Sequence, residues 1–194
     1  MHQHEEHWVD LLGHRYAFHA TVNQLVNGLL GPRSPAVEPL TPEAIFVINT
    51  ALVWMPGALA ILRSPVHRFP VLAMAGIVLV NALTHIVSGL LLRAYNPGLL
   101  TAVVMLLPLA GFVYGYAMRH EPWLKPQILS ALAWAVGAHA LMVGGMLAAN
   151  WFEWVPQWLW FVTLVAWGLM PAALFAGRRA TPVLASASGA PERA

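Results

Sequence analysis

Five long apolar stretches constrain this chain more than any other feature. They cover residues 42–62, 70–92, 98–118, 127–149 and 156–176. A helix needs about 20 apolar residues to cross the roughly 30 Å hydrocarbon core of a bilayer. Because 59% of the 194 residues are hydrophobic and 9% are charged, too little polar surface exists to cover a water-soluble globule of this size. The sequence therefore predicts an all-α, polytopic membrane protein of about five transmembrane helices, with the lipid bilayer as its first partner.

The first 30 residues have a different pattern, in which apolar and polar side chains fall on opposite faces of a helix. Their apolar positions recur at spacings of three, four or seven: Trp8, Leu11, Phe18, Val22, Leu25 and Leu29. We expect an amphipathic helix over 1–30 at the membrane interface and a proline-rich loop over 31–41. Together with the first three spans they form a unit of residues 1–118. Residues 119–177 supply two further transmembrane helices, and 178–194 are predicted to be a disordered tail.

Basic side chains predict how the spans are oriented. One group lies beside the loops after the first, third and fifth spans: Arg63, Arg68, Arg119, Lys125, Arg178 and Arg179. The other side of the membrane would have only Arg15, Arg33 and Arg93. We expect a multi-pass protein of the cell membrane. Because loops rich in Lys and Arg stay in the cytoplasm, its C-terminus would be cytoplasmic and its N-terminal helix would face outward.

Composition also excludes some functions. The ten Lys and Arg residues nearly balance the eight Asp and Glu residues, so the chain has no basic patch with which to bind nucleic acid. Cysteine is absent, which excludes disulfides, thiolate nucleophiles and zinc sites built on cysteine. Any metal ion must therefore be bound by His, Asp, Glu or Asn side chains.

The chain opens with MHQHEEHW, a cluster of histidines and glutamates. His2 lies three residues before Glu5 and four before Glu6, so on a helix its imidazole lies between two carboxylates. This set suits a divalent metal ion, or a histidine made more basic by neighbouring negative charge. The same residues could instead form the solvated face of an interfacial helix, whose early acidic residues also suit the helix dipole. We expect His4 and His7 to point to solvent.

Polar residues inside the second span favour a functional site. Asn81, His85 and Ser88 lie along one stripe of an otherwise apolar helix, and polar groups at that depth usually face a partner or a water-filled cavity. His85 is about 10 Å from the outer end of the span, near the expected position of the N-terminal helix. The alternative is a histidine that only hydrogen-bonds between helices.

Three other polar positions have simpler interpretations. Asn49, in the first span, could hydrogen-bond to the polar stripe of the second. His139, in the fourth span, lacks a strong polar neighbour in the sequence, and we interpret it as structural. The sequence YNPG at 95–98 is typical of a turn, and we interpret it as a tight connection between two spans.

Several short motifs accompany the N-terminal sequence. H-x-x-E-E begins at His2, and FVIN at 46–49, VW at 53–54, NALTH at 81–85 and YNPGLLTA at 95–102 follow. In this combination the chain resembles the HXXEE family of small bacterial membrane proteins, over roughly residues 2–118. The resemblance implies motif positions at His2, Glu5, Glu6, Asn81, His85 and Tyr95, and it assigns no activity. Members of that family typically have a hydrophobic segment before H-x-x-E-E, so we expect the gene product to begin upstream of Met1 with a further transmembrane helix.

These patterns lead to the hypothesis of one polar site near the outer leaflet. Its metal ligands for a divalent ion would be His2, Glu5, Glu6 and His85. Its neighbours, which would support the ligands or contact substrate, would be Asn49, Asn81 and Tyr95. The metal could activate water or polarise a carbonyl or phosphoryl group of a lipid-like small molecule. Without metal, Glu5 or Glu6 could act as a general base beside His85.

Two other classes of function stay open. The chain could be a non-catalytic membrane scaffold, whose polar residues fix helix packing or bind a partner. Proton-coupled transport along His85 and His139 is less favoured, because no acidic residue lies deep within the spans to complete a relay. Geometry separates these classes, since an enzyme needs the N-terminal motif to converge on His85.

Overall fold

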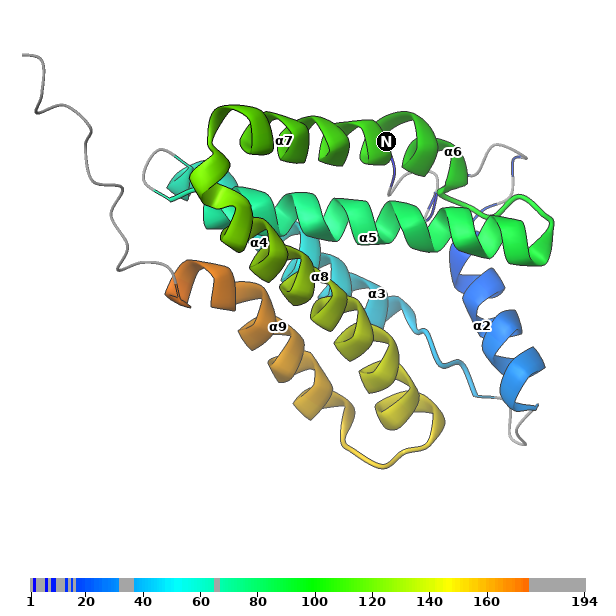
Figure 1. The fold of residues 1–194 in the computed structure, drawn as a ribbon. Helices are drawn as coiled ribbons and strands as arrows, with labels where there is room; N and C mark the ends of the chain where they lie inside the picture. Colours follow the sequence, from blue (N-terminus) through cyan, green and yellow to red (C-terminus); the bar gives the residue numbers. More distant parts are fainter. Residues whose placement is uncertain are drawn as a thin grey trace, which may run out of the picture.

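The computed structural model describes residues 2, 6, 8, 9, 13, 15, 17–31, 37–64 and 67–174 of the chain. Within these residues the secondary structure is helical, with no β-strand and one isolated β-bridge between Val9 and Arg15. Figure 1 shows α5 (Phe69–Leu92) in the middle of the bundle, with α7 (Leu107–His120) beside it and α2 (Ala17–Leu30) at one end. The predicted all-α fold is confirmed.

Four segments are long and apolar enough to cross a membrane. They are Pro42–Arg63, Phe69–Leu92, Leu99–His120 and Pro122–Trp151, and they correspond to the first four predicted spans. The fifth predicted span corresponds to α9 (Gln157–Leu174), whose 18 residues extend for about 27 Å. The four longer segments are consistent with a multi-pass membrane protein, while the count of five spans stays a prediction.

Two of the four segments contain a wide π-helical turn just before a proline. In the first, α3 (Pro42–Asn49) continues through Thr50–Trp54 into α4 (Met55–Arg63), which has Pro56 in its first turn. In the third, α6 (Leu99–Thr101) continues through Ala102–Leu106 into α7, with Pro108 in the same position. Proline has no N–H, and its ring clashes with the carbonyl four residues earlier, which here lies inside the wide turn. The extra residue in that turn lets the helix continue past the proline.

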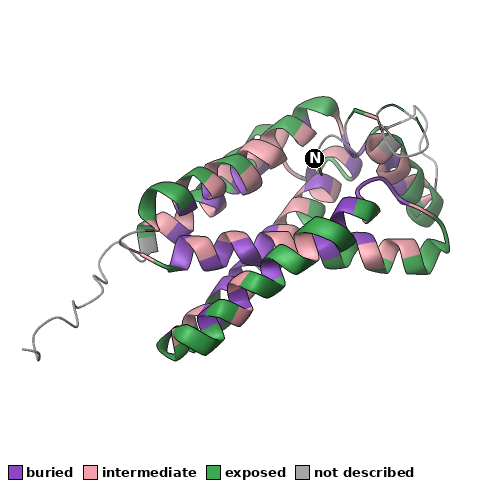
Figure 2. Ribbon diagram, turned by 90° about the horizontal axis from the view of Figure 1, so that it is seen from above, coloured by how far each residue is buried: buried purple, intermediate pink, exposed green. Residues whose placement is uncertain are grey.

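The core forms where α5 packs against α7 and against α8 (Lys125–Met146). Small residues let α5 and α8 approach closely: a Cβ atom on Gly76 would lie 2.9 Å from the Cβ of Ala135. On the α7 side, the hydroxyl of Tyr114 donates a hydrogen bond of 2.9 Å to the carbonyl of Leu72. Figure 2 shows the buried residues where these helices face one another and the exposed ones on the outside of the bundle. Many of the outward side chains are apolar, as expected for helices that face lipid.

The N-terminal region differs from the single helix expected over 1–30. The described helix, α2, begins at Ala17, and before it Gly13 adopts a φ of +82° next to the Val9–Arg15 bridge. The chain therefore reverses direction ahead of α2. Asn23 on α2 hydrogen-bonds to both the N–H and the carbonyl of Leu40, at 2.8 and 3.1 Å, so α2 is tied to the segment that leads into α3. This break leaves His2 and Glu6 free to lie against the bundle.

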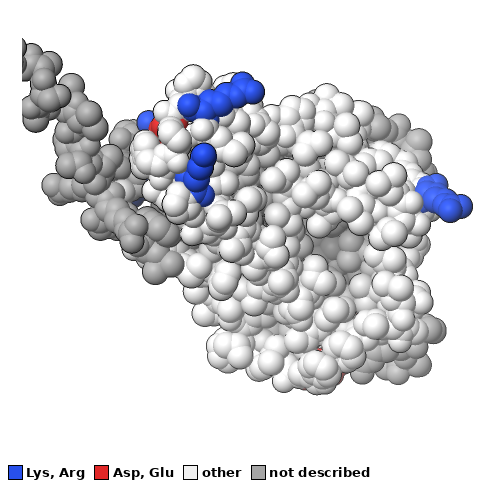
Figure 3. All heavy atoms as spheres, viewed as in Figure 1, with Lys and Arg blue, Asp and Glu red and all other residues white. Residues whose placement is uncertain are grey.

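Basic side chains separate along the molecule as the sequence suggested. Arg63 and Arg68 flank the connection from α4 to α5, and Arg119 and Lys125 flank the connection from α7 to α8. Arg93 lies at the opposite end of α5. Figure 3 shows basic side chains gathered at one end of the molecule and a basic side chain at the other. This separation supports the predicted orientation, but which end faces the cytoplasm stays a prediction.

Candidate metal centre

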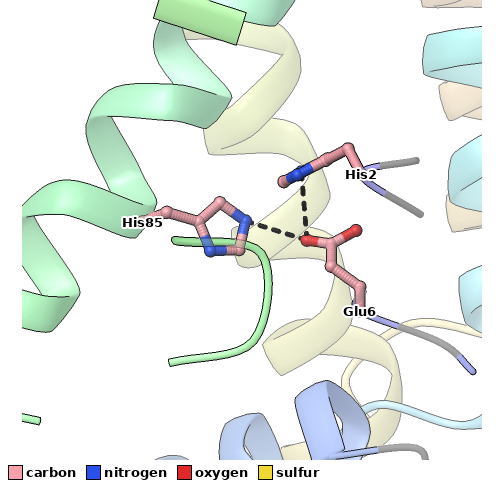
Figure 4. A group of neighbouring side chains, drawn as sticks. All are labelled: His2, Glu6 and His85. Carbon is pink, nitrogen blue, oxygen red and sulfur yellow. Dashed lines mark ion pairs between the residues drawn. The ribbon is translucent and has the colours of Figure 1, made fainter. Parts of the chain in front are cut away.

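Two side chains from the N-terminal segment, His2 and Glu6, meet His85 of α5 toward the end of that helix nearest Arg93. The Nε2 atom of His85 lies 2.8 Å from Oε1 of Glu6, and the Nε2 atom of His2 lies 3.4 Å from the same oxygen. One potential ligand atom from each residue lies within 4.8 Å of the other two. Figure 4 shows that the three side chains point toward one another. Glu6 and His85 are only 6% and 4% exposed, so water is largely excluded from this cluster.

The connection between α5 and α6 forms one wall of the cluster. Gly98 has a φ of +93°, a conformation that favours glycine. A Cβ atom there would lie 2.7 Å from Cε1 of His85, 2.9 Å from Cε1 of His2 and 3.1 Å from Cγ of Glu6. Glycine is therefore required both by the backbone and by the three side chains packed against it. The interpretation of YNPG as only a tight connection is too narrow.

The other ring nitrogen of His85 is held by Asn96, from the same connection. The side-chain amide of Asn96 donates to the backbone carbonyl of His85 at 2.8 Å, so its oxygen must face Nδ1 of His85, also at 2.8 Å. An oxygen in that position accepts a hydrogen bond, which assigns the proton of a neutral imidazole to Nδ1. The lone pair of Nε2 then points at Glu6.

His2 follows the same pattern with different partners. The hydroxyl of Thr101 donates to the carbonyl of Gly98 at 3.2 Å and lies 2.6 Å from Nδ1 of His2, from which it accepts. The side-chain amide of Asn81 approaches Nε2 of His2 at 2.7 Å and donates to its lone pair. Both histidines are thus oriented through Nδ1 by an outer partner. Nε2 of His85 faces the carboxylate of Glu6 at 2.8 Å, whereas Nε2 of His2 lies 3.4 Å from it and accepts from Asn81, whose amide would have to turn away before His2 could bind a metal ion.

The charge of Glu6 explains why this arrangement needs a cation. Burial by itself raises the pKa of Glu6, but hydrogen bonds and positive charge from His2 and His85 outweigh it and lower the pKa to about 2. Glu6 is therefore ionised at neutral pH. Because Nδ1 of His85 already donates its proton to Asn96, a carboxylate oxygen 2.8 Å from Nε2 calls for a second proton on the ring or for a metal ion.

One of the separations in the cluster has the spacing expected for a metal with nitrogen and oxygen ligands. Zinc bonds to histidine and carboxylate are about 2.0–2.2 Å long, so two ligands of a tetrahedral site lie about 3.3 Å apart. The separation of 3.4 Å between His2 and Glu6 matches this spacing. The His85–Glu6 separation of 2.8 Å is that of a hydrogen bond, and it would lengthen by about 0.5 Å around the ion.

The structure places the remaining predicted residues as follows. Asn81 contacts His2 directly. Asn49 is half-buried at the end of α3, and Tyr95 is half-buried in the connection between α5 and α6; their roles stay predictions. Nδ1 of His139 donates to the carbonyl of Ala135 at 2.9 Å, within its own helix. Glu5, His4, His7 and the predicted tail lie outside the described residues.

Sequence reasoning missed three residues that complete the cluster: Asn96, Gly98 and Thr101. All three lie in or beside the YNPGLLTA motif, which was a usable signal. Their types, however, are also typical of a turn followed by a helix start, and that simpler explanation accounted for them equally well.

Comparison of the sequence with protein families gives a match. The family model described as "Protein of unknown function with HXXEE motif" matches residues 1–114. This chain belongs to the HXXEE family. The match ends within α7, so every residue of the cluster lies inside the HXXEE region, and α8 and α9 lie beyond it. The H-x-x-E-E motif itself begins at His2, and its last glutamate is Glu6. No curated protein and no solved structure matches this HXXEE protein significantly.

Proposed function

We propose that this HXXEE protein binds a divalent metal ion, most suitably Zn²⁺, through His2, Glu6 and His85. The observation that carries the proposal is the convergence of two Nε2 atoms on one carboxylate oxygen, with both Nδ1 atoms held by neighbours. Metal-binding histidines commonly donate their second ring N–H to such an outer partner, which fixes the tautomer and the ring orientation. A single ionised Glu would balance half of the charge of the ion.

Three protein ligands leave one position of a tetrahedral site open, as in catalytic zinc sites. Water in that position would be activated, or a carbonyl or phosphoryl oxygen would be polarised by the metal. Because the cluster lies at the end of a candidate span, we propose a lipid-like molecule as substrate. Asn81 could instead occupy the fourth coordination position, if its side-chain amide turned so that its oxygen faced the ion. Glu5 stays a proposed general base or additional ligand.

Replacing Glu6 with glutamine is expected to abolish stoichiometric zinc binding. Glutamine preserves the size of the side chain but removes the charge that a divalent ion needs. The measurement is elemental analysis of protein purified in detergent after equilibration with Zn²⁺, with Glu43→Gln as the control. This control makes the same change from glutamate to glutamine at an exposed position in the first turn of α3. Equal zinc content in both variants would reject the proposed ligand set, and gel filtration would show whether each variant is folded.

Loss of an outer partner should weaken the site without removing a ligand. Thr101→Val removes the hydroxyl that accepts from Nδ1 of His2, and we expect zinc to bind about 10–100-fold more weakly. Thr84→Val is the matched control, because both threonine hydroxyls donate to the carbonyl three residues earlier and only Thr101 also holds His2. Competition with a fluorescent zinc chelator measures both affinities. An unchanged affinity in Thr101→Val would show that His2 is not a ligand.

A specific observation also supports a second function, in which the cluster binds no metal and fastens the N-terminal segment to the bundle. The Glu6–His85 distance of 2.8 Å is already that of a charge-assisted hydrogen bond, and both ring nitrogens of His2 have partners. This function corresponds to the non-catalytic scaffold. It predicts the same thermal unfolding with and without a chelator, whereas the metal site predicts a lower Tm after chelation.

A further inference from the structure

A groove lies beside the same α5–α6 connection. Its volume is about 460 Å³, within the range of small-molecule sites. Apolar side chains from the end of α5 and from the start of the third span line most of it: Ile86, Leu90, Leu99 and Val103. Its polar side chains are those of Arg93 and Tyr95, at the end where α5 stops.

The surroundings of the groove are those of a lipid-facing surface. Leu90 and Leu91 are 72% and 78% exposed, and Val87 and Val104 are also exposed. Apolar side chains left open on a spanning segment face acyl chains and not water. The occupant must therefore be apolar over most of its length and polar at one end.

Arg93 determines the charge at that end. It is exposed, and no carboxylate in the described part of the chain forms an ion pair with it. The backbone of Arg93 is left-handed, with a φ of +49°, at the position after a helix where glycine is usual. Arginine is well suited to phosphate, because its planar guanidinium can donate two parallel hydrogen bonds to two oxygens.

We propose that this groove binds an anionic phospholipid, with one acyl chain between α5 and the third span and the headgroup phosphate at Arg93 and Tyr95. The inference names the class of lipid for the reaction proposed above, and to that extent it rests on the proposed function; the binding step itself does not require the metal. Apolar lining selects a lipid, and the positive charge of Arg93, with which no described carboxylate pairs, selects one with a net negative headgroup.

The same connection joins the groove to the metal centre. Arg93 and Tyr95 line the groove, whereas Asn96 and Gly98, the next residues along, contact the cluster. Gly89 borders both: a Cβ atom there would lie 3.1 Å from Leu99, in the groove, and 3.3 Å from the Asn96 amide that holds His85. A lipid in the groove would therefore lie one layer of residues from the proposed ligands.

Native mass spectrometry of the full chain tests the proposal, with equal amounts of phosphatidylglycerol and phosphatidylcholine added to the detergent micelles. Wild-type protein should retain phosphatidylglycerol preferentially, and Arg93→Gln should reduce that retention by about tenfold, as expected for loss of a charged hydrogen bond. Arg119→Gln is the control, since Arg119 is an exposed arginine in the last turn of α7. Equal retention of the two lipids, or equal losses in the two variants, would overturn the proposal.

A second pair of variants tests the groove itself. Val103→Trp should fill the groove and release both lipids, while Val104→Trp, one residue further and outside the lining, should release neither. A dimer that Val103→Trp dissociates, with no lipid bound to the wild type, would show that a second chain occupies the groove and would reject the lipid. Glu6→Gln should keep phosphatidylglycerol, and Arg93→Gln should keep zinc. Failure of the metal site and failure of the lipid site are therefore distinguishable.

Discussion

Replacing His85 with alanine is expected to lower the free energy of unfolding by about 3–5 kcal/mol, the usual cost of removing one partner from a buried charged pair. Glu6 is 6% exposed, and its Oε1 lies 2.8 Å from Nε2 of His85. Without that imidazole the carboxylate loses its shortest hydrogen bond, and the ring leaves a gap beside Gly98. A metal ion at the site would add its own binding energy to the loss.

Equilibrium unfolding in mixed detergent and SDS micelles measures this difference. His139→Ala is the control, because it removes a half-buried histidine of α8 whose Nδ1 donates to the carbonyl of Ala135 in its own helix. We expect the control to lose about 1–2 kcal/mol, mainly through lost packing and one hydrogen bond. If His85→Ala and His139→Ala are equally stable, the Glu6–His85 contact does not hold the N-terminal segment.

Replacing Gly98 with alanine is expected to cost about 2–5 kcal/mol and to abolish zinc binding. The left-handed backbone accounts for about 1–2 kcal/mol of that cost. Crowding accounts for a further 1–3 kcal/mol, roughly the usual penalty of overpacking, because the new methyl group would lie 2.7 Å from His85 and 2.9 Å from His2. Both rings would have to move, and the two Nε2 atoms would no longer face one oxygen.

Gly31→Ala separates these two contributions. Gly31 also has a positive φ, of +86°, but no atom of the described residues lies within 4 Å of the position of its Cβ. It should therefore show the backbone cost alone and keep full zinc content. The same SDS titration and elemental analysis serve for both variants. A Gly98→Ala protein with the stability of Gly31→Ala and normal zinc would show that Gly98 does not shape the site.

Much of the fold follows from the sequence because the bilayer itself fixes the length of a span. Four of the predicted spans agree with the observed segments to within a few residues at most boundaries. The N-terminal region was less predictable, because its amphipathic spacing continues on both sides of Gly13. The spacing of apolar residues does not reveal that one residue, Gly13, has a positive φ. The chain reverses direction at that point because its N-terminal segment contacts the bundle.

The site was predictable where a polar side chain lies within an apolar membrane span. His85 and Asn81 were expected to have partners because a spanning helix otherwise excludes such side chains, and His2 was the nearest candidate on the same side of the membrane. Asn96, Gly98 and Thr101 could not be recognised in the same way. They lie where polar and small residues are ordinary, so only the structure distinguishes a wall of the site from a turn.

The cluster also constrains how the protein is assembled. Glu6 and His85 are 79 residues apart in the sequence, and the chain between them contains the first span and most of the second. Thr101, which holds His2, belongs to the start of the third. The ligands can therefore meet only after the first two segments have been inserted, and Thr101 joins them when the third is in place. Contact between the ligands closes a long loop whose entropy has by then been reduced by the membrane. A chain in which insertion stalls after one span would lack the site altogether, so bound metal would report insertion of at least the first two spans.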